Sequence, residues 1–202
     1  MKKGALILSQ PFERYLPAPF VIAADAGYLR AAEKGIKADL LVGDFDSLGY
    51  CPQGMEVVTV PVEKDFSDGE LGVRVAALRG IRELDIYGAT GGRPDHFLYN
   101  LNLLKIAFDL GVSAVIRGDN FDIYYVTSNF FLPATVGDTL SIVPFGESVH
   151  ILKATGLKYP AEGVTLTKKD TRGLSNECTS DKVFVSVAEG SALLIHSFKE
   201  VR

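Results

Sequence analysis

Charged residues, most of them acidic, recur directly after short apolar runs in the first half of this 202-residue chain. If those runs are strands of a parallel sheet, the residues share its carboxyl edge, where ligands bind in open α/β sheets. Carboxylates gathered there repel one another unless a cation compensates, and their oxygen ligands suit Mg²⁺, so the pattern indicates a divalent-metal site. A single aspartate after a strand is more often a helix cap or a turn residue. The residues concerned are Asp25, Asp44, Asp46, Lys64, Asp65, Asp68 and Asp95.

Two of these positions have a more specific arrangement. Residues 44–47 read Asp-Phe-Asp-Ser, so two carboxylates stand two residues apart and point to the same side if the segment is extended. Residues 67–70 read Ser-Asp-Gly-Glu, a capping-box sequence that predicts the start of a helix. Asp68 then lies in the first helical turn, where stabilisation by the helix dipole explains it nearly as well as metal binding.

A glycine-rich loop at residues 88–96 reads Gly-Ala-Thr-Gly-Gly-Arg-Pro-Asp-His. Its amides can turn toward an anion, the following helix N-terminus adds positive potential, and Arg93 can donate two hydrogen bonds to a phosphate. The loop therefore predicts a phosphate cradle. It is neither a Walker A sequence nor a dinucleotide fingerprint, and a tight turn with a surface arginine explains it equally well. For His96, we rank orienting Asp95 or capping the helix ahead of proton transfer.

The elements that must position these residues alternate through residue 118. Short apolar runs are separated by segments of helical periodicity, which is typical of a parallel sheet covered by helices. The expected strands are 5–8, 20–24, 39–42, 56–60, 84–87 and 114–117. One helix is expected to begin at Ser67 and end by Gly80, and another to begin at Pro94 and end before Gly111. Their predicted buried faces are Leu71, Val75 and Leu78, and Phe97, Leu101, Leu104 and Phe108.

Beyond residue 118 the helical period disappears. Alternating β-branched and aromatic runs, punctuated by Gly, Pro and Asp, predict a small antiparallel β domain, for which we expect a sandwich. Residues 183–187 and 192–195 flank Glu189-Gly190 and are expected to form a hairpin. The predicted fold is a parallel-sheet α/β domain over residues 1–118 followed by an antiparallel β-sandwich over residues 119–202.

Composition excludes several classes of partner. Lys and Arg number 21 against 25 Asp and Glu, a net charge of -4, so nucleic acid is not an expected partner. Cys51 and Cys178 are too few for a disulfide framework, and we expect both to be buried in a protein of a reducing compartment. No apolar run approaches the ~18 residues of a membrane span or resembles a signal peptide, so we expect a cytoplasmic protein. His150 and His196 have no obvious partner and are expected to be surface or packing residues.

The ordered series of motifs resembles the thiamine pyrophosphokinase family. The resemblance extends over nearly the whole chain in the family's order, so the series is more specific than any one motif. It implies a nucleotide-binding α/β domain at residues 1–118, a thiamine-binding β-sandwich at residues 119–202, and a homodimer with active sites between subunits. The motifs are Asp25-Ala26-Gly27, Gly43-Asp44-Phe45-Asp46-Ser47, Lys64-Asp65-Phe66-Ser67-Asp68-Gly69-Glu70, Gly91-Gly92-Arg93-Pro94-Asp95-His96, Asn100, Gly156-Leu157-Lys158-Tyr159 and Ser175-Asn176.

The resemblance implies an enzyme that uses Mg²⁺ to transfer a pyrophosphoryl group from ATP to the thiamine hydroxyl, giving thiamine diphosphate and AMP. Asp44, Asp46 and Asp68 then fall at metal positions. The ATP-binding positions are Asp25, Gly27, Lys64, Asp65, Gly91, Gly92, Arg93 and His96. The catalytic positions are Asp46, Asp68, Arg93 and Asp95, and the thiamine positions are Tyr159, Ser175 and Asn176. Ser67 stands where the family often has Thr, and Ala26 where it often has Gly.

Two other interpretations of the acidic cluster remain open. In the first, the protein is another Mg²⁺-dependent nucleotide phosphotransferase or hydrolase with a different acceptor. In the second, it is a non-catalytic nucleotide-sensing dimer, although a pure binding site needs fewer carboxylates beside phosphates. The residues also leave open whether Asp46 or Asp95 accepts the hydroxyl proton.

Overall fold

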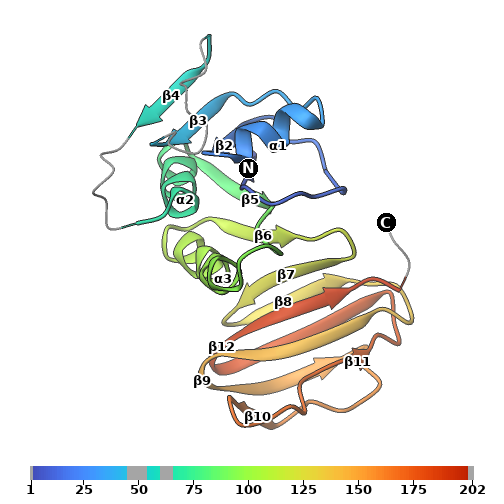
Figure 1. Ribbon diagram of the computed structural model, residues 1–202. Helices are drawn as coiled ribbons and strands as arrows, with labels where there is room; N and C mark the ends of the chain where they lie inside the picture. Colours follow the sequence, from blue (N-terminus) through green and yellow to red (C-terminus); the bar gives the residue numbers. More distant parts are fainter. Residues whose placement is uncertain (1, 45–53, 60–65, 200–202) are drawn as a thin grey trace. The chain divides into compact units, whose positions relative to one another are not determined.

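The computed structural model describes residues 2–44, 54–59 and 66–199 (Figure 1). The chain divides into two compact units, an N-terminal unit at Met1–Gly118 and a C-terminal unit at Asp119–Arg202. Helices and parallel strands occur in the first unit and antiparallel strands in the second, so the expected mixed α/β fold is confirmed. Among the described residues, no helix combines the length and apolar character needed to cross a membrane.

The N-terminal unit is built on a parallel sheet. Its strands are paired in the order β4-β3-β2-β1-β5-β6. They are β1 (Lys2–Ile7), β2 (Val21–Ala24), β3 (Leu40–Gly43), β4 (Glu56–Thr59), β5 (Ile81–Tyr87) and β6 (Ser113–Arg117). The chain adds strands in one direction from β1 to β4 and then returns to place β5 on the other side of β1. The order therefore reverses between β1 and β5, a switch point at which open α/β sheets bind ligands.

Helices cover both faces of this sheet (Figure 1). They are α1 (Gly27–Glu33), α2 (Asp68–Leu78) and α3 (Pro94–Asp109). Alternate residues of β1 face opposite sides. Ala5 and Ile7 pack in a core that includes Ala31 of α1, whereas Leu6 lies close to Gly72 of α2. The apolar runs are thus buried on both faces, as a parallel sheet requires.

Helix α2 begins where the sequence predicts, because Ser67 Oγ accepts a hydrogen bond of 3.2 Å from the Glu70 amide. In the expected capping box the Glu70 carboxylate would also bind a backbone amide of the first turn. Instead it accepts hydrogen bonds from Arg74, one turn later. Leu71 and Val75 are buried as predicted. Leu78 is 86% exposed, because it ends the helix beyond the buried stretch, and its predicted burial is wrong.

The buried stripe of α3 differs from the predicted one. Leu103, Leu104 and Ala107 are buried, whereas Phe108 is half exposed. Apolar residues surround most of this helix, so hydrophobicity alone does not select one face. Packing against α2 and β6 selects the stripe centred on Leu104, and the prediction for Phe108 is wrong.

The C-terminal unit consists of antiparallel strands around one apolar core. The strands are β7 (Phe121–Val126), β8 (Asn129–Pro133), β9 (Thr139–Thr155), β10 (Val164–Thr167), β11 (Asn176–Glu177) and β12 (Lys182–Ser197). The long strands β9 and β12 run side by side (Figure 1). β12 pairs with β8 in its first part and with β7 in its last part, while β9 also pairs with β10 and β11.

The hairpin expected around Glu189-Gly190 is wrong, because β12 continues through this segment as one strand. The register against β9 shifts three times between Ser186 and Ala192, so the extra residues form bulges instead of a turn. Gly190 has a φ of 81°, and a Cβ there would lie 2.3 Å from the Ser148 carbonyl oxygen. The glycine is therefore needed because the two strands approach closely at this point. In the sequence, a glycine with this role cannot be distinguished from one in a turn.

The two histidines of this unit differ from one another. His150 Nδ1 is 2.9 Å from the Thr165 hydroxyl at the surface. His196 is buried, and its Nε2 is 2.8 Å from Oδ2 of the equally buried Asp138. His196 is thus a packing residue, as one of the two expectations had it, and antiparallel pairing supplies a partner 58 positions away that the sequence does not make obvious. Cys178 is buried as predicted, and Cys51 lies outside the described residues.

Candidate active site

The carboxyl ends of β1 and β5, on either side of the switch point, are joined by backbone hydrogen bonds. The Leu8 amide donates to the Tyr87 carbonyl oxygen at 2.9 Å, and the Gln10 amide donates to the Gly88 carbonyl oxygen at 3.2 Å. The Gln10 side chain continues under the glycine-rich loop, because a Cβ on Gly92 would lie 2.4 Å from Gln10 Oε1. The segment after β1 thus supports the loop after β5.

A cavity of about 200 Å³ opens at this edge of the sheet. Its walls come from the ends of β1 and β2 and from the first turns of α2 and α3. The lining residues are Leu8, Ser9, Ala24, Asp25, Ala26, Ser67, Asp68, Gly69, His96 and Asn100. Fold topology therefore gathers Asp25, Asp68 and His96, which are more than 70 positions apart at the extremes, around one small space.

Two of the lining residues, Asp25 and Asp68, also lie next to Gly43 at the end of β3. Gly43 has a φ of 140°, and a Cβ there would lie 3.2 Å from Asp68 Oδ1 and 3.4 Å from the Asp25 Cβ. Asp25 itself adopts a positive φ of 45°, which is uncommon for a residue with a side chain. A glycine at position 43 therefore suits the positive φ and leaves room for the Asp68 carboxylate beside it.

The Asp25 side chain has an unsatisfied oxygen. Its Oδ1 is buried and has no hydrogen-bond partner within the part of the chain that the structure describes. A buried carboxylate oxygen without a partner is costly, and a bound cation or hydrogen-bond donor removes that cost. Within the described ranges, no three Asp, Glu, His or Cys side chains form a metal site by themselves. The donor chemistry nevertheless fits a hard cation that also takes ligands from elsewhere.

The loop between β5 and α3 carries an exposed ion pair. Arg93, the residue before α3, donates through Nε and Nη2 to Asp95 at 3.1 and 2.5 Å. This hydrogen-bonded pairing with the Arg93 guanidinium lowers the pKa of Asp95 to about 2. Asp95 is consequently ionised at neutral pH and a weak base while the pair is formed. The N-cap residue Arg93 makes no side-chain capping bond to α3, whereas the Asp95 carboxylate is hydrogen-bonded to the His96 backbone.

A second, larger cavity of about 450 Å³ lies between α2 and α3. It shares Ser67, His96 and Asn100 with the first cavity, so the two adjoin. Four apolar or aromatic side chains line it, together with two carboxylates and four other polar residues. Its other lining residues are Phe66, Glu70, Asp95, Tyr99, Asn102, Leu103 and Ile106. An elongated ligand with a polar end and an aromatic end would match this pair of cavities.

The predicted thiamine residues lie together in the C-terminal unit. Both ends of the Asn176 side-chain amide are hydrogen-bonded to the backbone of Tyr159, at 2.9 and 2.7 Å. Ser175 precedes them with a positive φ of 55°, and its amide donates to Ser141 Oγ at 3.0 Å. The Tyr159 side chain is 59% exposed. The arrangement presents an accessible aromatic ring on a well-ordered backbone.

Other predicted site residues lie elsewhere. Asp44 directly follows β3 and lines neither cavity. The exposed-loop residues Gly91, Gly92 and Arg93 also line neither cavity. Gly27 is buried, and a Cβ there would lie 2.0 Å from the Ile7 carbonyl oxygen, so α1 needs this glycine to pack on β1. Asp46, Lys64 and Asp65 lie outside the described residues.

The predicted site omits several residues that the geometry identifies. Ser9 lines the first cavity and Gln10 supports the loop. The rule that selected the aspartates, a polar residue directly after a strand, also applies to them. Asn100 donates from Nδ2 to the Ala89 carbonyl oxygen at 2.8 Å and holds the glycine-rich loop against α3. Nothing in the spacing of Asn100 indicates this role, because the contact depends on how the loop folds back.

Comparison with known proteins identifies two matching family profiles. Residues 14–116, more than half of the chain, match "Thiamin pyrophosphokinase, catalytic domain". Residues 129–191 match "Thiamin pyrophosphokinase, vitamin B1 binding domain". A curated Bacillus subtilis protein named thiamine pyrophosphokinase is 28% identical over 184 residues, which cover 87% of this chain and 86% of the relative.

Solved structures agree with this result. The crystal structure of thiamine pyrophosphokinase from Bacillus subtilis has a TM-score of 0.85 at 24% identity and covers 98% of this chain and 100% of its own. A probable thiamine pyrophosphokinase from Staphylococcus saprophyticus has a TM-score of 0.71 at 28% identity, and the match covers 99% of this chain and 100% of that protein. The Candida albicans thiamin pyrophosphokinase retains a TM-score of 0.80 at 16% identity, covering 97% and 89%. The fold is therefore shared over nearly the whole length of these proteins.

Proposed function

The chain belongs to the thiamine pyrophosphokinase family, and from that premise we propose that it transfers a pyrophosphoryl group from ATP to the hydroxyl of thiamine. The products are thiamine diphosphate and AMP. The observation that carries the proposal is the approach of Asp25 and Asp68 around Gly43, with one buried carboxylate oxygen unsatisfied, in a cavity that adjoins a larger aromatic one.

The smaller cavity is the proposed place for the reacting phosphates and a Mg²⁺ ion. Asp68 and Asp44 would hold the metal together with Asp46, and Asp25 supplies a further oxygen beside them. Bound Mg²⁺ would neutralise the charge that develops on the phosphate oxygens during transfer. Ser67 and the α2 N-terminus add hydrogen-bond donors and positive potential at the same place.

The exposed loop is the proposed contact for the rest of ATP. Arg93 precedes the α3 N-terminus, where its charge and the helix dipole attract an anion. To donate both N–H groups to a phosphate, Arg93 must exchange Asp95 for the nucleotide. Lys64, Asp65, Gly91, Gly92 and His96 belong to the same proposed ATP-binding set.

The proton of the thiamine hydroxyl needs an acceptor within the site. Asp95 is a poor choice while Arg93 holds its pKa at about 2, because proton transfer is most efficient when the pKa of the base is near the working pH. Asp46 is then the alternative acceptor. Arg93 and Asp95 are proposed to act in catalysis by stabilising charge and by orienting the nucleotide.

Thiamine carries a cationic thiazolium ring, which favours aromatic and acidic surroundings. The larger cavity offers Phe66 and Tyr99 with Glu70, and the C-terminal unit offers Tyr159, Ser175 and Asn176. We assign the catalytic, ATP-binding role to residues 1–118 and the thiamine-binding role to residues 119–202, which we classify as a β-sandwich. By resemblance to the family, the proposed active form is a homodimer with sites between subunits. The proposed location is the cytoplasm.

The nucleotide product distinguishes this function from its alternatives. Incubation with ATP, Mg²⁺ and thiamine, followed by mass spectrometry, should show AMP and thiamine diphosphate in equal amounts from the first time points, without prior thiamine monophosphate. ADP as the main thiamine-dependent product would instead indicate a different phosphotransferase. Nucleotide binding without turnover would indicate a sensor.

A further inference from the structure

The segment that carries Tyr159 is attached to the Ser175–Cys178 segment by a short ladder. The Thr179 amide donates to the Gly156 carbonyl oxygen at 2.8 Å, Leu157 forms a β-bridge with Cys178, and the Lys158 amide donates to the Glu177 carbonyl oxygen at 2.9 Å. At the next step the backbone of Asn176 is not available to Tyr159, because it pairs with Leu140 of β9. The ladder would therefore end at Lys158.

The side chain of Asn176 extends the ladder by one residue. Its Oδ1 accepts from the Tyr159 amide at 2.9 Å, and its Nδ2 donates to the Tyr159 carbonyl oxygen at 2.7 Å. A carboxamide has the same donor and acceptor as a peptide group, so it can replace a peptide group opposite one residue. The two bonds also fix the orientation of the amide, since the flipped form would satisfy neither.

The left-handed backbone of Ser175 allows the Asn176 side-chain amide to take the place of a peptide group. With φ at 55° and its amide bonded to Ser141, Ser175 turns the chain so that Asn176 joins β9 with its backbone and the Tyr159 segment with its side chain. Lys158 is held at the same time by Glu177 at 2.8 Å, and its Nζ lies 5.8 Å from the centre of the Tyr159 ring. The positive charge next to the ring is thus compensated.

We propose that Asn176 is a positioning residue that sets the place of the Tyr159 ring for thiamine, and that it acts on thiamine binding through Tyr159 instead of by direct contact. This inference rests on the proposed function. The exposed ring stacks on the substrate, while one edge of the Asn176 amide is committed to the protein backbone. Leu at position 176 would remove both hydrogen bonds at similar side-chain volume, and Asp would keep the acceptor for the Tyr159 amide while losing the donor.

A double-mutant cycle tests the indirect action. Asn176→Leu and Tyr159→Ala should each raise KM for thiamine by about tenfold and leave KM for ATP within about twofold, and the double variant should be no worse than the poorer single variant. Asn176→Asp should raise KM for thiamine by only about two- to fivefold. Asn120→Leu, at an exposed position in the same unit, is the matched control. If the increases in KM for thiamine in the two single variants multiply in the double variant, Asn176 contacts thiamine itself. That result would overturn the inference.

Amide hydrogen exchange gives a readout that does not need turnover. In the unliganded protein, the Tyr159 amide should exchange at least about tenfold faster in Asn176→Leu than in the wild type, while core amides of β9 keep their protection. Unchanged exchange at Tyr159 would overturn the inference even if activity falls. If the wild-type protein makes no thiamine diphosphate, the proposed function and the substrate part of the inference fail together, whereas the exchange result still decides whether Asn176 holds the segment.

Discussion

At the scale of single residues, two charged groups and one glycine decide what the cavity edge can do. Arg93 lowers the pKa of Asp95, and Gly43 leaves room for the Asp68 carboxylate beside it. Neither effect follows from a residue's type alone. Each effect depends on a neighbouring residue within a few ångströms. Each can therefore be tested by changing Arg93 or Gly43 and measuring the pKa of Asp95 or the activity.

The Asp95 carboxyl should titrate near pH 2 in the folded protein, because hydrogen bonding to the Arg93 guanidinium lowers its pKa to about 2. A folded pKa below the ordinary value near ~3.9 means that the pair stabilises the fold at higher pH and loses that contribution as the pH falls toward 2. Carbon-13 NMR of the carboxyl group measures the pKa directly. Arg93→Met should return it to near ~3.9, and an unchanged value would show that Arg93 is not the cause.

Gly43→Ala should lower kcat/KM by about tenfold or more, because the added Cβ crowds the Asp68 carboxylate at 3.2 Å and the backbone favours glycine. Gly35→Ala is the matched control, since Gly35 also has a positive φ but nothing lies within 4 Å of a Cβ there. The control should lose about 1 kcal/mol of stability by thermal unfolding and keep full activity. Equal activity losses in both variants would contradict the role of Gly43.

At the scale of elements, side-chain hydrogen bonds fix the segments that surround the site. Ser67 caps α2, whose first turn lines both cavities. Tyr87, at the end of β5, holds the segment after β1, since its hydroxyl accepts from the Leu16 amide at 3.1 Å and donates to the Leu16 carbonyl oxygen. The local sequence around Ser67 indicates its cap, whereas the contact of Tyr87 spans 71 positions and becomes visible only in the fold.

Ser67→Ala should destabilise the protein by about 1 kcal/mol, because the Glu70 amide loses its acceptor. Ser67→Thr keeps the hydroxyl and should cost only a few tenths of that amount. Chemical denaturation of the two variants gives both values. An equal loss in both would indicate that the volume at position 67, and not the cap, determines stability.

Tyr87→Phe should weaken the protein's sensitivity to alkaline pH. Burial raises the pKa of Tyr87 to about 12, so this hydroxyl stabilises the fold below the ordinary tyrosine value of ~10 and loses that contribution as the pH rises toward 12. Thermal unfolding of both proteins between about pH 9 and 12 measures the difference. The variant should be less stable at neutral pH, since the Leu16 amide loses its acceptor, and should lose less on alkalisation. Parallel curves would contradict this assignment.

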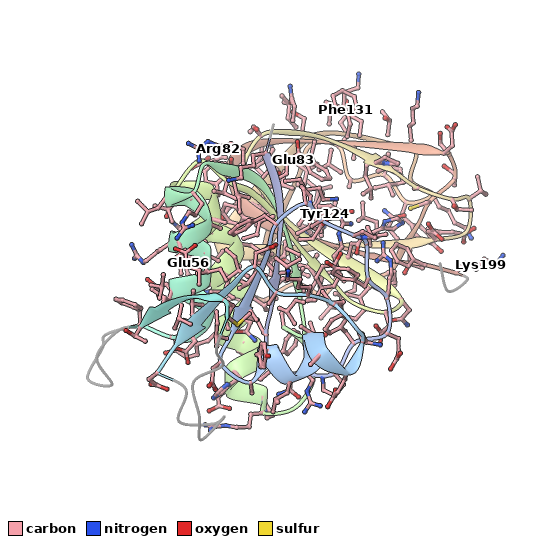
Figure 2. All side chains as sticks on the ribbon, turned by 90° about the horizontal axis from the view of Figure 1, so that it is seen from above. Glu56, Arg82, Glu83, Tyr124, Phe131 and Lys199 are labelled. Atoms are coloured by element: carbon pink, nitrogen blue, oxygen red, sulfur yellow. The ribbon has the colours of Figure 1, made fainter. Side chains whose placement is uncertain are left out.

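At the scale of the whole molecule, the proposed site draws on both units. The residues around the two cavities all belong to the N-terminal unit, and Tyr159, Ser175 and Asn176 belong to the C-terminal unit. An isologous homodimer would contain two such sites. Each unit exposes apolar side chains, among them Tyr99 on α3 and Phe131 on β8. Figure 2 labels Phe131.

Mixing two impaired variants, assayed at a thiamine concentration far below KM, tests whether a site is shared between subunits. Asp68→Asn disables the N-terminal contribution, and Tyr159→Ala weakens the C-terminal one. After subunit exchange in a 1:1 mixture, half of the dimers are mixed and each has one intact site, so about a quarter of wild-type activity should return. Exchange should be verified with differently tagged chains. No recovery after verified exchange would place each complete site within one chain.

The sequence by itself determined the features that depend on short-range pattern. Local sequence patterns predict the cap at Ser67, the strands up to β6 and the motif series of the family. Helix caps and strand periodicity involve residues that are neighbours in the chain. The carboxyl edge of a parallel sheet also follows from strand order, so the placing of Asp25 and Asp68 near one edge was predictable. The burial of Cys178 follows from residue type.

Only the tertiary structure decided which residues meet within that framework. Local periodicity contains no distance between Asp25 and Asp68, no choice of face for the apolar α3, and no distinction between a turn and the bulge at Gly190. The pairing of His196 with Asp138 and the clamp of Asn176 on Tyr159 likewise join residues 58 and 17 positions apart. Such contacts arise from packing and strand register, which many distant residues set together, so a local pattern cannot specify them.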